Sequence, residues 1–312
     1  MTKLSALPTT THDGLDSHFS HLSRLPHLSP WTVRVRFGLW VPNPGVHQGV
    51  PVDRPEVSPP STEVPSGVDE LFDQPALWRA EVIDRHVPGP LHAIAASAAP
   101  GFPQLMPMLT RAADHAPAGP CLDIGAGLGG ISTMWATASA RDVIAVDPGQ
   151  GSTLGARRLF DSLSVVQGSG HALPVRSASI AAAVLIGVTS LLEDVEVLAS
   201  ELARVLLVGG RVCIVDLVAN GHDEVIAPPN WFRPLESIEC MMGSRYEVAE
   251  RALADPSVGS WAEVGGYVAA RVEAEHDGDP AFDMWRTDQH HLAEMIESGE
   301  VLVGATVLTL RS

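Results

Sequence analysis

Residues 121–130 read Cys-Leu-Asp-Ile-Gly-Ala-Gly-Leu-Gly-Gly, and this stretch decides the fold. Its first half predicts the end of a buried strand. The glycines predict a tight loop, because a residue without a Cβ tolerates positive φ and lets a ligand approach closely. The residues from Ile131 to about Ala138 predict a helix whose first amides point into the loop. Val143–Asp147 predicts a second strand, which ends in a carboxylate 24 residues after Asp123, a spacing suited to binding ribose hydroxyls.

The glycines fit two registers. Gly125, Gly127 and Gly130 fit the G-x-G-x-x-G pattern of dinucleotide-binding proteins. Asp123 with Gly125, Gly127 and Gly129 fits D-x-G-x-G-x-G, and this pattern resembles the class I S-adenosylmethionine (SAM) methyltransferases. An acid would repel a pyrophosphate, but it suits the ammonium and sulfonium of the methionine end of SAM. We therefore favour the second register and keep an NAD(P)-dependent oxidoreductase as the alternative.

Composition narrows the class of partner. The chain has 312 residues, 45% of them apolar, which allows one large domain with an appendage or two small domains. The net charge is −17 and the only lysine is Lys3, so a nucleic-acid partner is disfavoured. The three cysteines are odd in number and show no metal-ligand spacing, which is typical of a reducing compartment. There is no signal-like N-terminus, and the apolar run at 180–185 is too short for a bilayer. We expect a cytoplasmic protein that does not associate with a membrane.

Three regions follow from the pattern along the chain. Residues 1–67 are rich in proline and predict an extended arm, with an edge strand or hairpin arm at 31–41. The arm either packs on the main domain or serves as a lid or dimer-exchange segment, which leaves a homodimer open. Residues 68–118 predict a helical cap, in which Pro75 begins the better helix. Residues 119–312 predict the core, with a lid insert at about 225–260.

After Asp147 the chain alternates helices with apolar strands, which implies a parallel sheet covered on both faces. The C-terminal part predicts a strand at 266–273, a helix at 281–298 and a closing strand at 301–310. The expected fold is α/β: a Rossmann-like, doubly wound, mostly parallel sheet with helices on both faces and an N-terminal helical and extended region. The methyltransferase resemblance, which covers about residues 112–312, implies that the last strand enters antiparallel.

The resemblance also implies a cofactor site for SAM. Asp123, Gly125 and Gly127 would hold the methionine part, Asp147 would bind the ribose hydroxyls, and the loop of Ser169 would flank the adenine. The full set of cofactor-binding residues that we expect is Asp123, Gly125, Ala126, Gly127, Gly129, Asp147, Pro148, Gly168, Ser169, Gly170 and Gly187. The chain departs from the family where Ser169 replaces an acid and where Ile180-Ala181 replaces Phe-Asp. A core that binds SAM without methylating therefore stays open.

Methyl transfer needs alignment above all, and a base only when the acceptor must lose a proton of high pKa. His222 follows the fifth strand, at the edge where ligands bind in this architecture, and it is the candidate base; a solvated loop histidine is the alternative. No carboxylate cluster at ligand spacing accompanies the histidines, so we expect no metal. Aromatic and methionine side chains in residues 228–246 predict either a substrate wall or a plain packing helix. The expected activity is methyl transfer to a small organic, moderately hydrophobic acceptor, with specialised metabolism as one setting.

Overall fold

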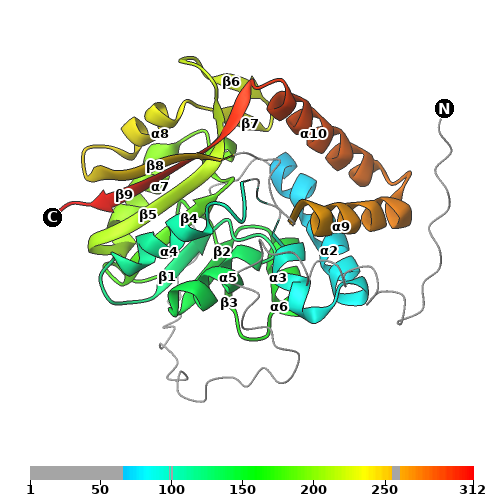
Figure 1. The fold of residues 1–312 in the computed structure, drawn as a ribbon, viewed down its shortest axis with the longest axis horizontal. Coiled ribbons are helices and arrows are strands. Elements are labelled where there is room, and N and C mark those ends of the chain that lie inside the picture. Colours follow the sequence, from blue (N-terminus) through cyan, green and yellow to red (C-terminus); the bar gives the residue numbers. More distant parts are fainter. Residues whose placement is uncertain (1–65, 98, 100, 255–260) are drawn as a thin grey trace. The chain divides into compact units, whose positions relative to one another are not determined.

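A seven-stranded sheet forms the centre of the computed structural model, which describes residues 66–312 except 98, 100 and 255–260 (Figure 1). The strand order is β3-β2-β1-β4-β5-β9-β8. The five strands from β3 to β5 are parallel, β9 is antiparallel to β5, and β8 is antiparallel to β9. The strands are β1 (Cys121–Ile124), β2 (Val143–Asp147), β3 (Ser164–Gln167), β4 (Ile180–Ile186), β5 (Leu206–Ala219), β8 (Tyr246–Ala254) and β9 (Val301–Leu310). The predicted fold, including the antiparallel closing strand, is confirmed.

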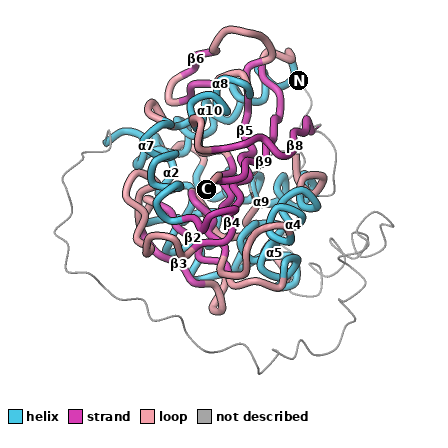
Figure 2. The backbone as a smooth tube through the Cα atoms, turned by 90° about the vertical axis from the view of Figure 1, so that its left-hand side faces the viewer, coloured by secondary structure: helices cyan, strands magenta, loops and turns pink. Residues whose placement is uncertain are grey.

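The helices lie on both faces of this sheet. In Figure 2 the strands stand between α7 on one side and α4 and α5 on the other. A small hairpin of β6 (Val225–Ala227) and β7 (Asn230–Phe232) follows β5. The helices are α2 (Ser66–His86), η4 (Gly89–Leu91), α3 (His92–Ala95), α4 (Met106–Asp114), α5 (Gly130–Ser139), α6 (Gln150–Leu159), η5 (Thr189–Leu191), α7 (Val195–Val205), α8 (Leu235–Met242), α9 (Trp261–His276) and α10 (Pro280–Glu297).

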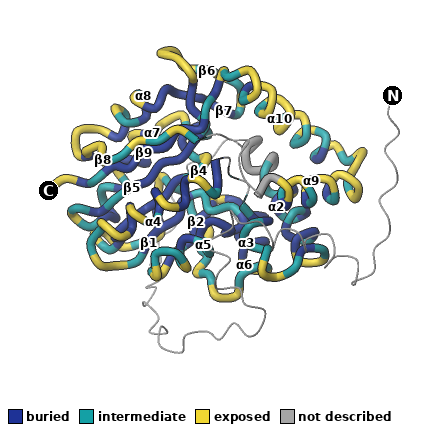
Figure 3. Tube along the Cα trace, in the orientation of Figure 1, coloured by how far each residue is buried: buried dark blue, intermediate teal, exposed yellow. Residues whose placement is uncertain are grey.

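Side chains that alternate along the strands build two apolar layers, because successive residues of a strand point to opposite faces. On β4, Ala183 and Leu185 pack toward α7 and α8, whereas Ala182 and Val184 pack toward α4 and α5. The central strands are accordingly buried along their length, while the outer side of α10 is exposed (Figure 3). Helices cover both faces of the sheet, so a ligand binds at the edge formed by the carboxyl ends of the parallel strands. The carboxyl ends of β1, β2 and β4 lie together there.

Two expectations about local structure were wrong, and a third could be compared only at its end. Pro75 lies inside α2 rather than at its start. Residues 266–273 form part of α9 instead of a strand, because Val264, Val268 and Val272 recur every four residues and are all buried on one side of the helix. Most of the expected arm at 1–67 lies outside the described residues; its last two residues already belong to α2.

The insert expected at about 225–260 is a composite. It contains the β6–β7 hairpin, then α8, and then β8, which is an edge strand of the main sheet. The part that forms β8 is therefore not a lid. A lid role stays a prediction for the hairpin alone. The division into a cap at 68–118 and a core at 119–312 likewise remains our proposal, since Gly67–Ser312 make one compact unit.

Candidate functional site

The glycine loop follows β1 and leads into α5. Gly125, Gly127 and Gly129 have φ values of 72°, 53° and 76°, which lie in the left-handed region that glycine adopts without strain. A Cβ on Gly129 would stand 2.5 Å from the Leu163 side chain, whereas a Cβ on Gly127 would meet nothing within 4 Å. The loop therefore turns tightly on packed neighbours and has open space at Gly127. This space is where a ligand could approach the backbone.

Gly130 serves a different purpose from the three loop glycines. It is the first residue of α5, and a Cβ there would stand 2.4 Å from the carbonyl oxygen of Ala93 in the α3 region. The residue is glycine because a helix of the cap packs against it. This explains the fourth glycine of the motif without a pyrophosphate, and it supports the register of Gly125, Gly127 and Gly129.

Asp147, at the end of β2, faces this loop. Its Oδ2 accepts a hydrogen bond from the Gly127 amide at 2.8 Å, and its Oδ1 accepts one from the Gly149 amide at 2.9 Å. Burial raises the pKa of the Asp147 carboxyl, with Asp73 adding repulsion, while the two backbone donors oppose the rise. The carboxylate is thus fixed beside the open glycine. Pro148 follows it, and its carbonyl accepts a hydrogen bond from Gln167 Nε2 at 3.0 Å.

Asp123 lies inside the protein beneath the loop. Its Oδ2 accepts a hydrogen bond from Ser132 Oγ of α5 at 2.6 Å, and the residue is 2% exposed. Burial raises the pKa of Asp123 to about 7, the Ser132 bond lowers it, and Asp147 raises it further. The side chain therefore joins β1 to α5. A direct contact with the ammonium of a bound ligand stays a prediction.

The loop after β3 runs next to Asp147. The amide of Gly168 donates to the Asp147 carbonyl at 3.0 Å, which ties the two strand ends together. Ser169 Oγ accepts a hydrogen bond from the amide of His171 at 3.2 Å, and Ser169 forms an isolated antiparallel bridge with Ala172. A serine hydroxyl that accepts one hydrogen bond can also donate its own proton. Its place beside an adenine stays a prediction, as does that of Gly170.

The segment after β4 completes this edge. Gly187 has a φ of 66°, and a Cβ there would meet nothing within 4 Å. The Gly187 amide donates to the Val215 carbonyl of β5 at 2.8 Å, so the chain leaves the sheet at this residue. Asp147, Gly127 and Gly187 thus lie on the shared carboxyl edge of β2, β1 and β4. The structure brings together the loops that carry the predicted cofactor-binding residues.

The cap helix α2 packs closely on α6 through two glycines of α6. A Cβ on Gly151 would stand 2.0 Å from the Asp73 carbonyl oxygen, and one on Gly155 would stand 2.9 Å from Ala80 Cβ. Asp73 Oδ1 also accepts a hydrogen bond from the Gly151 amide at 2.9 Å, and so caps α6 from another helix. Sequence reasoning missed Asp73; the small-residue spacing of Gly151 and Gly155 is the signal that could have found it.

Two neighbours on α2 have separate environments. Trp78 is buried and stacks on His276 of α9, with ring centroids 4.2 Å apart. Arg79 donates from Nη2 to the Ala95 carbonyl at 3.4 Å, and burial lowers its pKa to about 10. The half-buried Arg79 side chain therefore reaches from α2 to α3.

The candidate base has a different setting. His222 is exposed in the loop that joins β5 to β6. The base of this loop is fixed, because Asn220 Nδ2 donates to the Gly299 carbonyl at 2.8 Å and its amide donates to the Glu300 carbonyl at 3.0 Å. For His222 itself, no hydrogen bond or ion pair joins it to another described residue. A catalytic role stays a prediction.

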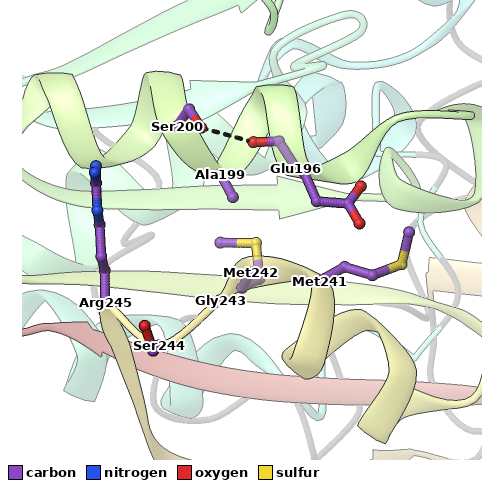
Figure 4. Close-up of a pocket in the computed structure, with 8 residues that line it drawn as sticks. All are labelled: Glu196, Ala199, Ser200, Met241, Met242, Gly243, Ser244 and Arg245. Atoms are coloured by element: carbon purple, nitrogen blue, oxygen red, sulfur yellow. Dashed lines mark hydrogen bonds between the residues drawn. The ribbon is translucent and has the colours of Figure 1, made fainter.

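The expected substrate wall at 228–246 does not form one surface. Phe232 is fully buried against Ala219, Met295 and Val301. Met241 and Met242 instead line a cavity of about 290 Å³ between α7 and the turn before β8 (Figure 4). Tyr246, the first residue of β8, pairs with Leu310 of β9. The neighbouring Thr309 pairs with Arg211, which lies near the amino end of β5. Tyr246 therefore lies at the level of the amino end of β5. This cavity therefore lies at the edge opposite the glycine loop.

Comparison with known proteins bears on this geometry. Residues 122–214 match a family model described as a methyltransferase domain. The stretch from β1 to β5 is therefore similar to a methyltransferase domain. The match begins in β1 and ends in β5, so it contains the glycine loop, Asp147, the Ser169 loop and Gly187. Comparison with curated protein sequences finds no match.

Several solved structures share the fold of this chain. The cyclase SpnF is 14% identical, with a TM-score of 0.59 over 78% of this chain and 96% of that one. A SAM-dependent methyltransferase from Geobacter sulfurreducens, in complex with S-adenosyl-L-homocysteine, is 19% identical, with a TM-score of 0.54 over 75% and 98%. A phosphoethanolamine N-methyltransferase of Haemonchus contortus is 16% identical, with a TM-score of 0.53 over 77% and 60%. At these identities the likeness shows the fold alone.

Two features are absent from the part of the chain that the structure describes. None of its helices combines the length and the hydropathy needed to cross a bilayer. Within the same residues, no group of three or more histidine, cysteine, aspartate or glutamate side chains is placed to hold a metal ion.

Proposed function

We propose that the protein binds SAM at the carboxyl edge of β1, β2 and β4 and transfers its methyl group to a small organic, moderately hydrophobic acceptor. The observation that carries the proposal is the position of Asp147. This carboxylate stands at the end of β2 and is bonded to the amide of Gly127, the loop glycine that has open space beside it. An adenosyl ligand needs an acceptor for its ribose hydroxyls and a backbone that it can approach closely. Asp147 and Gly127 would supply the two.

The residues of this edge fit such a ligand. When bound, SAM supplies a methyl group activated by a positively charged sulfur. Gly127 and Gly187 leave room for it, Asp147 would accept from the ribose, and the Ser169 loop would flank the base. Asp123 adds negative charge beneath the loop when it is ionised, which favours a cation above it. Alignment of the acceptor with the sulfonium then accounts for most of the rate.

The acceptor class rests on the surroundings of the cap. Trp78 of α2 and Phe282 and Trp285 of α10 form an aromatic cluster, with ring centroids 6.4 Å and 5.7 Å apart. Trp78 and Phe282 are buried, whereas Trp285 is half-buried. We assign the apolar side of the acceptor to this half-buried ring. The cytoplasmic location of the protein, the lack of a nucleic-acid partner and a homodimer remain predictions from the sequence.

A second candidate is a protein that binds SAM without methylating. One observation favours keeping it: the structure with the TM-score of 0.59 carries the name of a cyclase, so the fold alone does not fix methyl transfer. The oxidoreductase alternative is disfavoured, because a two-half dinucleotide fold would continue with parallel strands where β9 is antiparallel.

Calorimetric titration of the full chain with SAM, S-adenosylhomocysteine, NAD⁺ and NADH tests the proposal. Binding of both adenosyl ligands is expected. Tight binding of NADH with no response to the adenosyl ligands would overturn it. Transfer of a labelled methyl group to any member of a panel of phenols, amines and carboxylic acids would then separate a methyltransferase from a protein that only binds SAM.

A further inference from the structure

We propose that Asp216 and Arg233 are positioning residues that hold the segment after β4 against the glycine loop and thereby set the affinity for the cofactor. The inference deepens the proposed function and rests on it. Both residues act through Val188, which lies between them and the loop. The chain of contacts runs from Arg233 to Thr189, to its neighbour Val188, and from there to Gly125.

Asp216 holds the segment through side-chain hydroxyls. It is a buried residue of β5, 3% exposed, whose carboxylate accepts from Thr189 Oγ1 and from Ser190 Oγ, each at 2.7 Å. It also accepts from the amides of Ser190 at 3.0 Å and Leu217 at 2.8 Å. Four donors on one buried carboxylate offset its loss of hydration, so it is a firm anchor. Ser190 and Thr189 begin η5, so this anchor fixes the first turn after β4.

Arg233 holds the same segment through its carbonyls. Its buried guanidinium donates from Nη1 to the carbonyls of Thr189 at 3.2 Å and Leu192 at 2.9 Å, and from Nη2 to that of Glu193 at 3.2 Å. Leu192 and Glu193 follow the end of η5, where carbonyls lack partners within the helix, and the Thr189 carbonyl also accepts from the Leu192 amide at 3.4 Å. A planar fork of donors suits three converging oxygens, which a lysine ammonium would match less well. Thr189 is therefore held on its side chain by β5 and on its carbonyl by Arg233.

The segment so held is the one that touches the glycine loop. Val188 precedes Thr189, and its Cγ2 would stand 2.4 Å from a Cβ on Gly125. Gly187, the open glycine on the same edge, is bonded to Val215 at the other end of the segment. We call the contacts of Asp216 and Arg233 with residues 189–193 the clamp. Release of the clamp would let Val188 withdraw from Gly125. The loop would then lose the contact that keeps its first turn in place.

The clamp also reaches the loop of the candidate base. Arg233 directly follows the β6–β7 hairpin, and its carbonyl accepts from the Ala219 amide of β5 at 3.2 Å. Its Nε lies 3.3 Å from Glu224 Oε1, and Glu224 is two residues from His222. One arginine thus joins the loop of His222 to the segment beside the glycine loop. A shift of the loop that carries the candidate base could therefore reach the cofactor site through Arg233.

The test compares Arg233→Met with Arg251→Met in the full chain. Arg251 of β8 controls for the loss of a paired charge, because it forms an ion pair with Glu239 but is 51% exposed, and the melting temperature reports the effect of burial at Arg233. Binding of S-adenosylhomocysteine by calorimetry, the melting temperature and amide hydrogen exchange of residues 187–193 are measured for each. We expect Arg233→Met to weaken binding at least tenfold and to raise exchange in 187–193. Arg233→Lys should do the same to a smaller degree, and Arg251→Met should change binding less than twofold.

Val188→Ala should reproduce the binding loss, and the double variant with Arg233→Met should lose little more than either alone. Should Arg233→Met not fold, Ser190→Ala removes one Asp216 contact more gently and carries the same expectation. Unchanged binding and unchanged exchange in a folded Arg233→Met would overturn the inference. If the wild-type chain binds no adenosyl ligand, the proposed function fails, whereas the exchange of residues 187–193 still tests the clamp.

Discussion

Val188 fills the space that a side chain on Gly125 would need. A Cβ on Gly125 would stand 2.4 Å from Val188 Cγ2, although the two residues are 63 positions apart in the sequence. The contact joins the segment after β4 to the turn after β1, across two neighbouring parallel strands. The first glycine of the motif is therefore required by packing as well as by its φ of 72°.

This contact predicts that Gly125→Ala is more damaging than Gly127→Ala. Both residues have positive φ, which costs an alanine about 1–2 kcal/mol. Only Gly125 adds a steric clash, because nothing lies within 4 Å of a Cβ on Gly127. Urea denaturation should show a larger loss of unfolding free energy for Gly125→Ala. Equal losses would mean that Val188 yields freely.

Asp147→Ala should lose most of the affinity for S-adenosylhomocysteine while the fold survives. The change removes the acceptor for the ribose hydroxyls and leaves the amides of Gly127 and Gly149 without a partner. We expect at least tenfold weaker binding by calorimetry and an unchanged circular dichroism spectrum. Asp142→Ala is the control, since Asp142 is exposed just before β2. Unchanged affinity for Asp147→Ala would remove this residue from the site.

Asp123→Asn should stabilise the ligand-free protein, and more so at pH 8 than at pH 5. The pKa of Asp123 is raised to about 7 in the folded state from 3.8, so folding favours its protonated form. Its contribution to stability is complete below pH 3.8 and is lost as the pH rises through 7. Asparagine stays neutral and still accepts from Ser132. The difference in melting temperature between variant and wild type should grow by several degrees between the two pH values; a constant difference would contradict the assignment.

Gly151→Ala should destabilise the protein, whereas Gly266→Ala should not. Both glycines are helical, and alanine is intrinsically preferred in a helix by about 1 kcal/mol. A Cβ on Gly151 would stand 2.0 Å from the Asp73 carbonyl oxygen and would push α2 away, whereas one on Gly266 would meet nothing. Thermal unfolding should therefore shift down for Gly151→Ala and stay level or rise for Gly266→Ala. Equal shifts would show that α2 does not pack on Gly151.

The sequence predicted the parts of the fold that depend on local pattern. The strand, glycine loop and carboxylate at residues 121–147 have strong local signals, and the structure has them at nearly the expected bounds. The edge strand β8 was missed because most of its residues are exposed and several are charged, so its pattern resembles a loop. In α9 the pair Gly265-Gly266 masked a four-residue period of buried valines.

The site could be predicted where one short stretch supplies the geometry. Asp147 and the loop glycines are of this kind. Asp216 and Arg233 are not, because the residues that they hold lie 26 to 44 positions away in the sequence. Asp73 is still further from its partner, 78 positions before Gly151. No local spacing encodes such contacts, and they become visible only when the strands have been placed side by side.

The position of β9 has a consequence for how the chain reaches its native state. β9 pairs with β5 on one side and with β8 on the other. A ribosome that has not yet released residues 301–310 therefore holds a nascent chain in which the edge of β5 is open and β8 is unpaired. Open strand edges invite pairing with other chains. Until β9 is available, β5 and β8 are therefore the strands of this sheet that are open to pairing with another chain.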